Sequence, residues 1–440
     1  MFKKIDIPKV MFVATITAAV FAYGVAVGSY RIFPYGAIRY VATTLVETWT
    51  NFGMMTKTKP QAHLKQARYP GSGVIQAENT TSSGYILVNG FFDAGIELRL
   101  IDVKGNVVQR WPVQYSSLMG DKLEHIQPPA ARPNSDWHTG FNGALVEPDG
   151  SVVFNLIGGG LVKLDQCGSV EWLLRKMAHH SIEKSSDGGY WVPGQYYVED
   201  KPQHAGIATP YRIDTIMKVT ADGHVEKEVS VLDLIYAHDL VGVVFANNRM
   251  LRIFGERDLV HLNDIEELGA DLADAFPQFE AGDILLSLRE SNLVMVVDRT
   301  LSFIKWYQIG PWMQQHDADW QADGTITVFD NRYDRTNDGS ALGGSRVLSI
   351  NPTTRDVQTL YEQTQNPRFY TPTQGDHQFL ANGNILLTES ESGRAVEVSS
   401  NGQIIWQYIN RYSETEVVRL PDAIHYEREY FNPDAWSCDS

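Results

Sequence analysis

The chain has 440 residues, of which 43% are hydrophobic and 20% are charged, and this balance excludes extensive disorder. Its 53 acidic residues outnumber its 37 basic residues and give a net charge of −16. This negative charge disfavours a nucleic-acid partner, which requires a basic face.

The first predicted element is a transmembrane helix over residues 10–30, VMFVATITAAVFAYGVAVGSY. About 20 apolar residues span a bilayer as a helix, whereas the apolar core of a cleaved signal peptide has about 7–15. The length of the run and its lack of a clean A-x-A site favour a retained signal anchor over a cleaved peptide. Lys3, Lys4 and Lys9 precede the run, which predicts a short cytoplasmic N-terminus at residues 1–9. The sequence therefore predicts a single-pass membrane protein whose main body is periplasmic or extracellular.

Residues 31–80 are predicted to form a linker. Within it, RYVATTLVETWTNFGMM has apolar positions on one side, which is compatible either with an amphipathic helix on the membrane surface or with a short connecting helix. Cys167 and Cys438 are the two cysteines, so a disulfide-rich framework is excluded. An exported domain could pair them, but the sequence does not establish that they meet.

One pattern repeats from about residue 80 to about residue 415. Short apolar segments flank an Asp-Gly or Asn-Gly turn, which is a strong hairpin signal. Examples are GALVEPDGSVVFNL, HSIEKSSDGGYWVPG, HDADWQADGTITVFDN and HQFLANGNILLTES. A second set of strand–turn–strand segments lies between these hairpins, such as GGLVKLDQCGSVEWLL and RAVEVSSNGQIIWQYI.

Repeated hairpins of this kind favour a β-propeller of about six four-stranded blades. A β-sandwich would also contain many short strands, but it would not explain one pattern repeated along the chain. The predicted fold is all-β: a six-bladed propeller at residues 81–415, preceded by the transmembrane helix and followed by a C-terminal tail at residues 416–440.

Histidine recurs near the start of the predicted innermost strands, at His180, His261, His316 and His377. The innermost strands of a propeller line its central channel, so we expect these four side chains to converge at one mouth of the channel. A lone histidine is most often structural, but four at corresponding places in the repeats indicate a functional cluster.

Arginines follow the same segments, at Arg289, Arg332, Arg335 and Arg394. Some of them are expected in salt bridges between blades, but an arginine in the channel would bind an oxyanion. The sequence has no H-E-x-x-H, C-x-x-C, G-x-S-x-G or phosphate-loop motif. Histidine with arginine therefore suggests an anionic substrate such as a sulfate or phosphate ester.

At these residues the chain resembles the arylsulfotransferase family, in its broader second branch. The resemblance covers roughly residues 180–410 and rests on HLNDIEE, GDILLSLRESNLVMVVD, QQHDADWQADGTITVFDNR and GDHQFLANGNILLTES, in that order. It implies a six-bladed propeller that moves a sulfuryl group from a phenolic sulfate ester to a phenol. The implied reaction is ping-pong through a sulfated histidine, without a nucleotide sulfate donor and without a cofactor or metal.

The resemblance also implies roles for individual residues. His377 corresponds to the nucleophile, while His316 and His261 correspond to histidines that bind the sulfate or protonate the leaving phenolate. Arg335 best corresponds to the arginine that binds the sulfate oxygens. The residues assigned in this way are His377, His316, His261 and Arg335 for catalysis, with Arg289, His180 and Arg332 for substrate binding.

Two other functions remain open at this point. One is a membrane-anchored propeller that acts as a binding or scaffolding subunit without catalysis. The other is metal-dependent hydrolysis or lyase chemistry, for which Asp264, Asp317 and Asp376 beside the histidines are candidate ligands. An oligomeric or membrane-complex partner is also left open.

Overall fold

The computed structural model describes residues 6–30, 32–77, 83–93, 95–157, 159–246, 258–436 and 438. The chain forms two compact units, Met1–Ala62 and His63–Ser440. Lys3 and Lys4, on which the predicted membrane orientation partly rests, lie outside the described residues.

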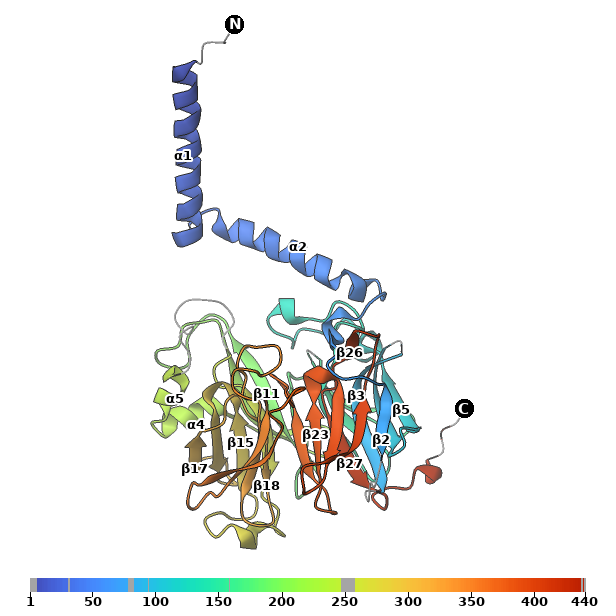
Figure 1. Ribbon diagram of the computed structural model, residues 1–440. Helices are drawn as coiled ribbons and strands as arrows, with labels where there is room; N and C mark the ends of the chain where they lie inside the picture. Colours follow the sequence, from blue (N-terminus) through green and yellow to red (C-terminus); the bar gives the residue numbers. More distant parts are fainter. Residues whose placement is uncertain are drawn as a thin grey trace. The chain divides into compact units, whose positions relative to one another are not determined.

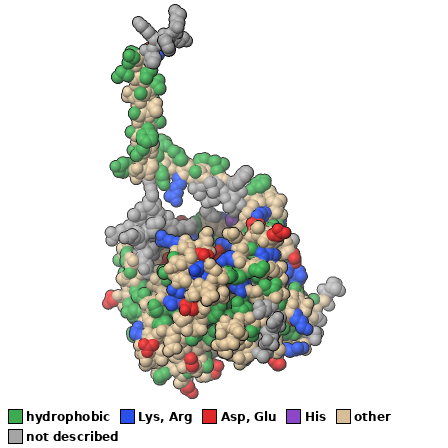
Figure 2. All heavy atoms as spheres, in the orientation of Figure 1, with side chains coloured by type: hydrophobic (Ala, Val, Ile, Leu, Met, Phe, Trp, Pro, Cys, Tyr) green, Lys and Arg blue, Asp and Glu red, His purple; other side chains and the backbone are tan. Residues whose placement is uncertain are grey.

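The N-terminal unit contains two helices, α1 (Ile7–Tyr30) and α2 (Tyr35–Met55) (Figure 1). Helix α1 has 24 residues, and a helix of that length is about 36 Å long. Apolar side chains are exposed along it (Figure 2). It is therefore long and apolar enough to cross a membrane, a property that a signal sequence would share. Helix α2 lies where the helical segment of the linker was predicted.

The second unit is a six-bladed β-propeller, which confirms the predicted fold. Blade 1 consists of β27 (Ala423–Glu427), β3 (Gly84–Phe92), β4 (Gly95–Asp102) and β5 (Val107–Val113). Blade 2 consists of β6 (Phe141–Val146), β7 (Val152–Leu156), β8 (Gly160–Leu164) and β9 (Val170–Leu174). Blade 3 consists of β10 (Glu183–Lys184), β11 (Tyr190–Val198), β12 (Tyr211–Val219) and β13 (Val225–Ser230).

Blade 4 consists of β14 (Leu262–Glu267), β15 (Ile284–Leu288), β16 (Leu293–Val297) and β17 (Ile304–Ile309). Blade 5 consists of β18 (His316–Trp320), β19 (Ile326–Asp330), β20 (Arg346–Ile350) and β21 (Val357–Glu362). Blade 6 consists of β22 (Asp376–Phe379), β23 (Ile385–Glu389), β24 (Arg394–Val398) and β25 (Ile404–Ile409), with β2 (Gly73–Ala77) at its outer edge. The remaining elements include β1 (Leu64–Gln66), β26 (Glu416–Val418), α3 (Tyr115–Met119), α4 (Val231–Ala237) and α5 (Val241–Ala246).

The ring closes by pairing the two ends of the chain. Strand β27 is the innermost strand of blade 1 and pairs with β3, while β2 pairs with β25 and β1 with β26. These strands extend beyond the boundaries predicted at residues 81 and 415, because β2 lies in the expected linker and β27 in the expected tail. The physical reason is that overlap of the two ends pairs strand edges that would otherwise be exposed.

The core lies between blades, where the faces of neighbouring sheets meet. Between blades 4 and 5, the ring of Trp320 packs edge-on against Phe276 at 4.7 Å and Phe279 at 5.3 Å between centroids. The predicted Asp-Gly turns form the hairpins at the blade ends. Gly324 has a φ of 81°, a conformation that favours glycine over residues with a side chain.

A disulfide joins Cys167, in the turn between β8 and β9, to Cys438 near the C-terminus. Two aromatic residues also attach this end of the chain to the propeller. The ring centroid of Trp436 lies 6.4 Å from that of Trp111 and 5.3 Å from that of Phe431, and Phe431 is itself buried. The pairing that the sequence left open is therefore present.

Candidate active site

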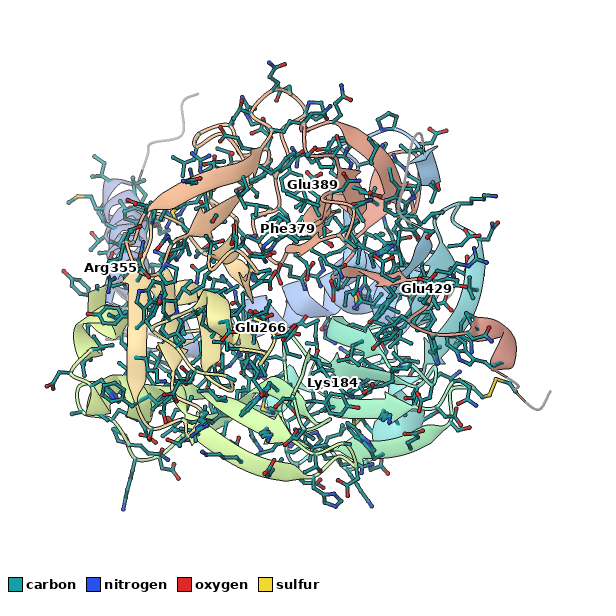
Figure 3. All side chains as sticks on the ribbon, turned by 90° about the horizontal axis from the view of Figure 1, so that it is seen from below. Lys184, Glu266, Arg355, Phe379, Glu389 and Glu429 are labelled. Carbon is teal, nitrogen blue, oxygen red and sulfur yellow. A yellow bond between two sulfur atoms is a disulfide. The ribbon has the colours of Figure 1, made fainter. Side chains whose placement is uncertain are left out.

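The six innermost strands line a channel through the centre of the propeller. Figure 3 shows Lys184, Glu266 and Phe379, from the innermost strands of blades 3, 4 and 6, around the centre of the ring. Two neighbouring cavities, which share lining residues such as Glu183 and Asp317, lie along this channel. The first, of about 80 Å³, contains His180 and His316 in its lining, and we call it the histidine cavity. The second, of about 420 Å³, contains His377 in its lining, and we call it the carboxylate cavity.

Strand register sets how far each histidine lies along the channel. His180 lies four residues before Lys184, the last paired residue of β10, and His316 lies four residues before Trp320, the last paired residue of β18. These two histidines therefore occupy corresponding positions in their blades. A bulge between His316 and Ala318 lets His316 pair with Phe329, three ladder steps from the Trp320–Ile326 pair.

The other two histidines do not share that position. His261 lies six residues before Glu267, the last paired residue of β14, whereas His377 lies only two residues before Phe379, the last paired residue of β22. The predicted equivalence of all four histidines is therefore corrected. His377 lies farther along the channel, in the carboxylate cavity, because its strand places histidine closer to the hairpin turn.

Three histidines and one arginine do converge, and we call His180, His261, His316 and Arg289 the histidine cluster. His180 Nε2 lies 3.2 Å from His261 Nε2, and His261 Nε2 lies 3.1 Å from an Arg289 guanidinium nitrogen. The ring centroids of His180 and His316 are 6.0 Å apart. Residues from blades 3, 4 and 5 thus meet at one end of the channel, as the sequence predicted for the three histidines.

The hydrogen bonds of Asn331 define the tautomer of His316. Asn331 donates its amide hydrogens to the carbonyl oxygens of Thr371, at 2.9 Å, and Gln374, at 2.5 Å. Its Oδ1 atom must therefore be the acceptor that faces His316 Nδ1, at 2.7 Å. Nδ1 carries the proton, so the lone pair of the neutral ring is on Nε2.

A carboxylate orients His261 in a similar way. Asp258 accepts a hydrogen bond from His261 Nδ1, which leaves His261 Nε2 to accept from Arg289. Arg289 also pairs with Glu290 at 3.0 Å, while its buried Nε has no hydrogen-bond partner among the described residues. The guanidinium thus has one donor that its protein neighbours do not use.

Burial keeps two of these histidines neutral. Burial, followed by the charge of His261, lowers the pKa of His180 well below its ordinary value. Burial, followed by the charge of Arg289, lowers the pKa of His316 to about 3. Both rings therefore carry a lone pair at neutral pH, which a nucleophile or a general base requires.

Both ring nitrogens of His377 are engaged in its own surroundings. Its side chain is fully buried, with Nδ1 at 2.5 Å from Asp317 Oδ2 and Nε2 at 2.8 Å from Thr327 Oγ1. A second carboxylate, that of Asp319, lies 3.5 Å from Nε2. The structure therefore does not bring His377 together with the histidine cluster.

Two of the predicted arginines also lie elsewhere. The side chain of Arg335 is exposed, in the long connection between β19 and β20. Arg332 is half-buried in the same connection, 3.9 Å from Glu362. Of the three arginines in the predicted site, Arg289 is the one that contacts a histidine of the cluster.

Carboxylates occupy corresponding positions deeper in the channel. Asp264, Asp317 and Asp376 each lie three residues before the last paired residue of their innermost strands. Ala318 N donates to Asp264 Oδ2 at 3.0 Å, and His377 N donates to Asp317 Oδ2 at 2.6 Å. Asp264 and Asp317 thus each accept a backbone N–H of the following blade, because an innermost strand has a paired neighbour on only one side.

A second set of carboxylates lies one residue before the end of the strands, at Glu183, Glu266 and Asp319. Burial raises the pKa of all three well above the ordinary range, with neighbouring carboxylates adding to the shift. Burial, followed by the charge of Asp317, also raises the pKa of Asp264 and of Asp422 to about 7. Five carboxyl groups, those of Glu183, Asp264, Asp317, Asp376 and Asp422, lie in the lining of the histidine cavity itself.

The raised pKa of Asp264 predicts that stability falls as pH rises. Between its ordinary pKa and about 7, the folded state holds a proton that the unfolded state has released, so the free energy of unfolding decreases with pH. We expect Asp264→Asn to reduce this decrease between about pH 5 and about pH 7, as measured by urea unfolding. The amide oxygen can still accept from Ala318. Asp323→Asn, in the exposed β18–β19 turn, is the control, and equal slopes in all three proteins would contradict the prediction.

Sequence reasoning missed several residues that support the cluster. His179 contacts His180 at 2.7 Å between their Nδ1 atoms, and Asp214 lies 3.4 Å from His179. Asn331 and Asp258 define the hydrogen-bonding of His316 and His261. The sequence contained a signal for two of these residues: His179 belongs to a His-His pair, and Asn331 belongs to the FDN motif. Asp214 and Asp258 come from other strands and loops, and no sequence pattern indicated them.

The fold and this site define a six-bladed propeller with a histidine–arginine centre at one end of its channel. Residues 146–411 match the family described as Arylsulfotransferase (ASST), which is more than half of the chain. The chain belongs to this arylsulfotransferase family. No curated protein sequence matches it.

Solved structures with propeller-like similarity are distant. A protein of unknown function from Bacteroides caccae is 12% identical, with a TM-score of 0.48 over 77% of this chain and 99% of that chain. Virginiamycin B lyase from Staphylococcus aureus is 12% identical, with a TM-score of 0.39 over 79% and 90%. A streptogramin B lyase is 14% identical, with a TM-score of 0.38 over 80% and 88%.

Proposed function

We propose that this protein transfers a sulfuryl group from a phenolic sulfate ester to a phenol, through a sulfated His316. Membership of the arylsulfotransferase family supports aryl sulfotransfer in general. The observation that carries the proposal is the hydrogen-bonding of Asn331, which leaves the lone pair of a neutral, buried His316 on Nε2. His377, the nucleophile assigned from the sequence, has both ring nitrogens engaged in hydrogen bonds, Nδ1 with Asp317 and Nε2 with Thr327.

In the first half-reaction, His316 Nε2 attacks the sulfur atom of the aryl sulfate. The N–S bond forms as the S–O bond to the ring breaks, and its electron pair leaves with the phenolate. The product is an imidazolium that carries the sulfuryl group on Nε2 and retains its proton on Nδ1, where Asn331 accepts the hydrogen bond. Arg289 donates to the sulfuryl oxygens, where negative charge must be stabilised in the transition state.

In the second half-reaction, the oxygen of an acceptor phenol attacks the same sulfur atom. His261 Nε2 takes the phenolic proton, and Asp258 stabilises the cation that results. The N–S bond breaks and returns its electron pair to His316. Over both half-reactions, the proton released by the acceptor phenol equals the proton that the phenolate product needs to become a phenol. The two half-reactions therefore balance without a further reactant.

Intact mass spectrometry of the full chain with p-nitrophenyl sulfate tests this function. We expect one sulfuryl group to be gained, to be located on His316 by peptide mapping, and to be lost on adding phenol. An adduct on His377 would contradict the nucleophile proposed here while preserving sulfotransfer. No adduct and no nitrophenol release by folded protein would favour the alternative of a binding or scaffolding propeller.

We also propose that α1 is retained as a membrane anchor and that the propeller lies on the periplasmic or extracellular side. The Cys167–Cys438 disulfide supports export, since disulfides persist in oxidising compartments. We expect the full chain to stay in the membrane pellet after alkaline carbonate washing, and a chain lacking residues 1–30 to be released. A mature protein whose N-terminus lies beyond α1 would instead identify a cleaved signal peptide.

A further inference from the structure

His377, Asp317 and Asp319 form a constellation that the proposed sulfotransfer does not use. One donor atom from each of them lies within 4.8 Å of the others. Asp317 and Asp319 belong to β18 of blade 5, and His377 belongs to β22 of blade 6. The constellation thus joins the innermost strands of two blades, in the carboxylate cavity.

Hydrogen bonds fix the tautomer of His377. Asp317 can only accept, so His377 Nδ1 carries the proton that Asp317 receives. On the other side of the neutral ring, Nε2 carries the lone pair and accepts from Thr327 Oγ1 at 2.8 Å, while Thr327 Oγ1 accepts from Gln321 Nε2 at 2.9 Å. His377 Nε2 is thus a lone-pair donor beside the Asp319 carboxylate.

This is the arrangement that metal-binding histidines use. Such a histidine commonly donates its second ring N–H to a carboxylate, which fixes the ring and makes the ligating nitrogen more basic. Two ligand atoms at about 2.1 Å from one ion lie about 3.0–3.4 Å apart. The observed separation of His377 Nε2 and Asp319 Oδ2 is 3.5 Å. A small movement of either side chain would accommodate an ion in place of the Thr327 hydroxyl contact.

The charge of the cavity also favours a cation. Its lining includes five carboxylates, those of Glu183, Glu266, Asp317, Asp319 and Asp376. Lys184 is the one Lys or Arg in this lining, and its ammonium group is paired with Glu147. A bound divalent ion would therefore supply positive charge to a lining rich in carboxyl oxygens and poor in cationic side chains.

We propose that His377 Nε2 and the Asp319 carboxylate bind a divalent transition-metal ion, with Asp317 as the residue that positions His377. Water from the cavity completes the coordination, with Glu266 and Glu183 available nearby. A nitrogen donor combined with carboxylates selects Zn²⁺ over Mn²⁺, and both over Ca²⁺ and Mg²⁺. The ion holds blades 5 and 6 together at the channel, a role independent of sulfotransfer at His316.

The test measures metal content and affinity in the full chain, in detergent, after treatment with a chelator and exposure to Zn²⁺ or Mn²⁺. We expect about one ion per chain by elemental analysis after desalting, and a higher melting temperature with Zn²⁺. Co²⁺ should give a visible d–d absorption band that is lost in His377→Gln. Asp319→Asn and His377→Gln should abolish stoichiometric binding, and Asp317→Asn should weaken it by about 10- to 100-fold.

Asp323→Asn, in the turn of the same blade, is the matched control and should retain the ion. Circular dichroism establishes that each variant is folded. If His377→Gln does not fold, Asp319→Asn still tests the site, because asparagine has nearly the same shape as aspartate. Failure of the wild-type chain to retain Zn²⁺ or Mn²⁺ would overturn the proposal. So would retention of wild-type stoichiometry by folded Asp319→Asn.

Discussion

Replacing His316 with alanine is expected to abolish formation of the sulfuryl adduct and to stop nitrophenol release from p-nitrophenyl sulfate. The reason is that no other ring of the histidine cluster has its lone pair directed by a fixed amide in this way. His180 Nε2 and His261 Nε2 face one another at 3.2 Å, and His261 Nε2 also accepts from Arg289. The measurement is single-turnover nitrophenol release together with intact mass.

Neighbouring variants separate the roles within the cluster. Arg289→Ala should still allow adduct formation but slow it by about 10²–10³-fold, as loss of one oxyanion donor does in other enzymes. Asn331→Ala should slow adduct formation, because it allows the other tautomer of His316. Asn331→Asp should also be slow, because a carboxylate beside Nδ1 would favour the imidazolium form, which has no lone pair for attack. His377→Ala is the matched control, and we expect it to form the adduct. Loss of the adduct in folded His377→Ala, with retention in His316→Ala, would reverse the assignment.

Removing the Cys167–Cys438 disulfide is expected to lower the free energy of unfolding by about 2–5 kcal/mol. The bond spans a sequence separation of 271 residues, so its loss increases the entropy of the unfolded chain. It also lies just beyond β27, the strand that closes the ring on β3. Without the bond, the chain end is held chiefly by the packing of Trp436 and Phe431.

Chemical denaturation of Cys438→Ser and Cys167→Ser, compared with wild type under oxidising and reducing conditions, measures this effect. The two variants and the reduced wild type should have the same lowered midpoint, because each lacks the same bond. If only the C-terminal tail is released, the free energy of unfolding should fall by an amount near the lower end of this range. Faster cleavage of the variants by carboxypeptidase would detect such a released tail. Equal midpoints for oxidised wild type and both variants would contradict the prediction.

The sequence alone was sufficient for the apolar helix and for the propeller. Both follow from local rules, since a run of apolar residues sets a membrane-length helix, and Asp-Gly or Asn-Gly turns between β-rich segments set hairpins. The recurrence of one hairpin pattern then indicated blades arranged in a ring. Convergence of His180, His261 and His316 was also predicted, because innermost strands share one channel, although the same prediction included His377.

Only the tertiary structure decided how deep each side chain lies in that channel. His377 and His316 begin similar motifs, but a difference in strand register, which includes a bulge after His316, places them in the lining of different cavities. The roles of the supporting residues could not be predicted from the sequence either. Asp258 and Asn331 are identified by their hydrogen bonds to His261 and His316, and these contacts depend on the folded structure. Ring closure by β27 was missed for the same reason: strand pairing between chain ends is a long-range contact that leaves no local pattern.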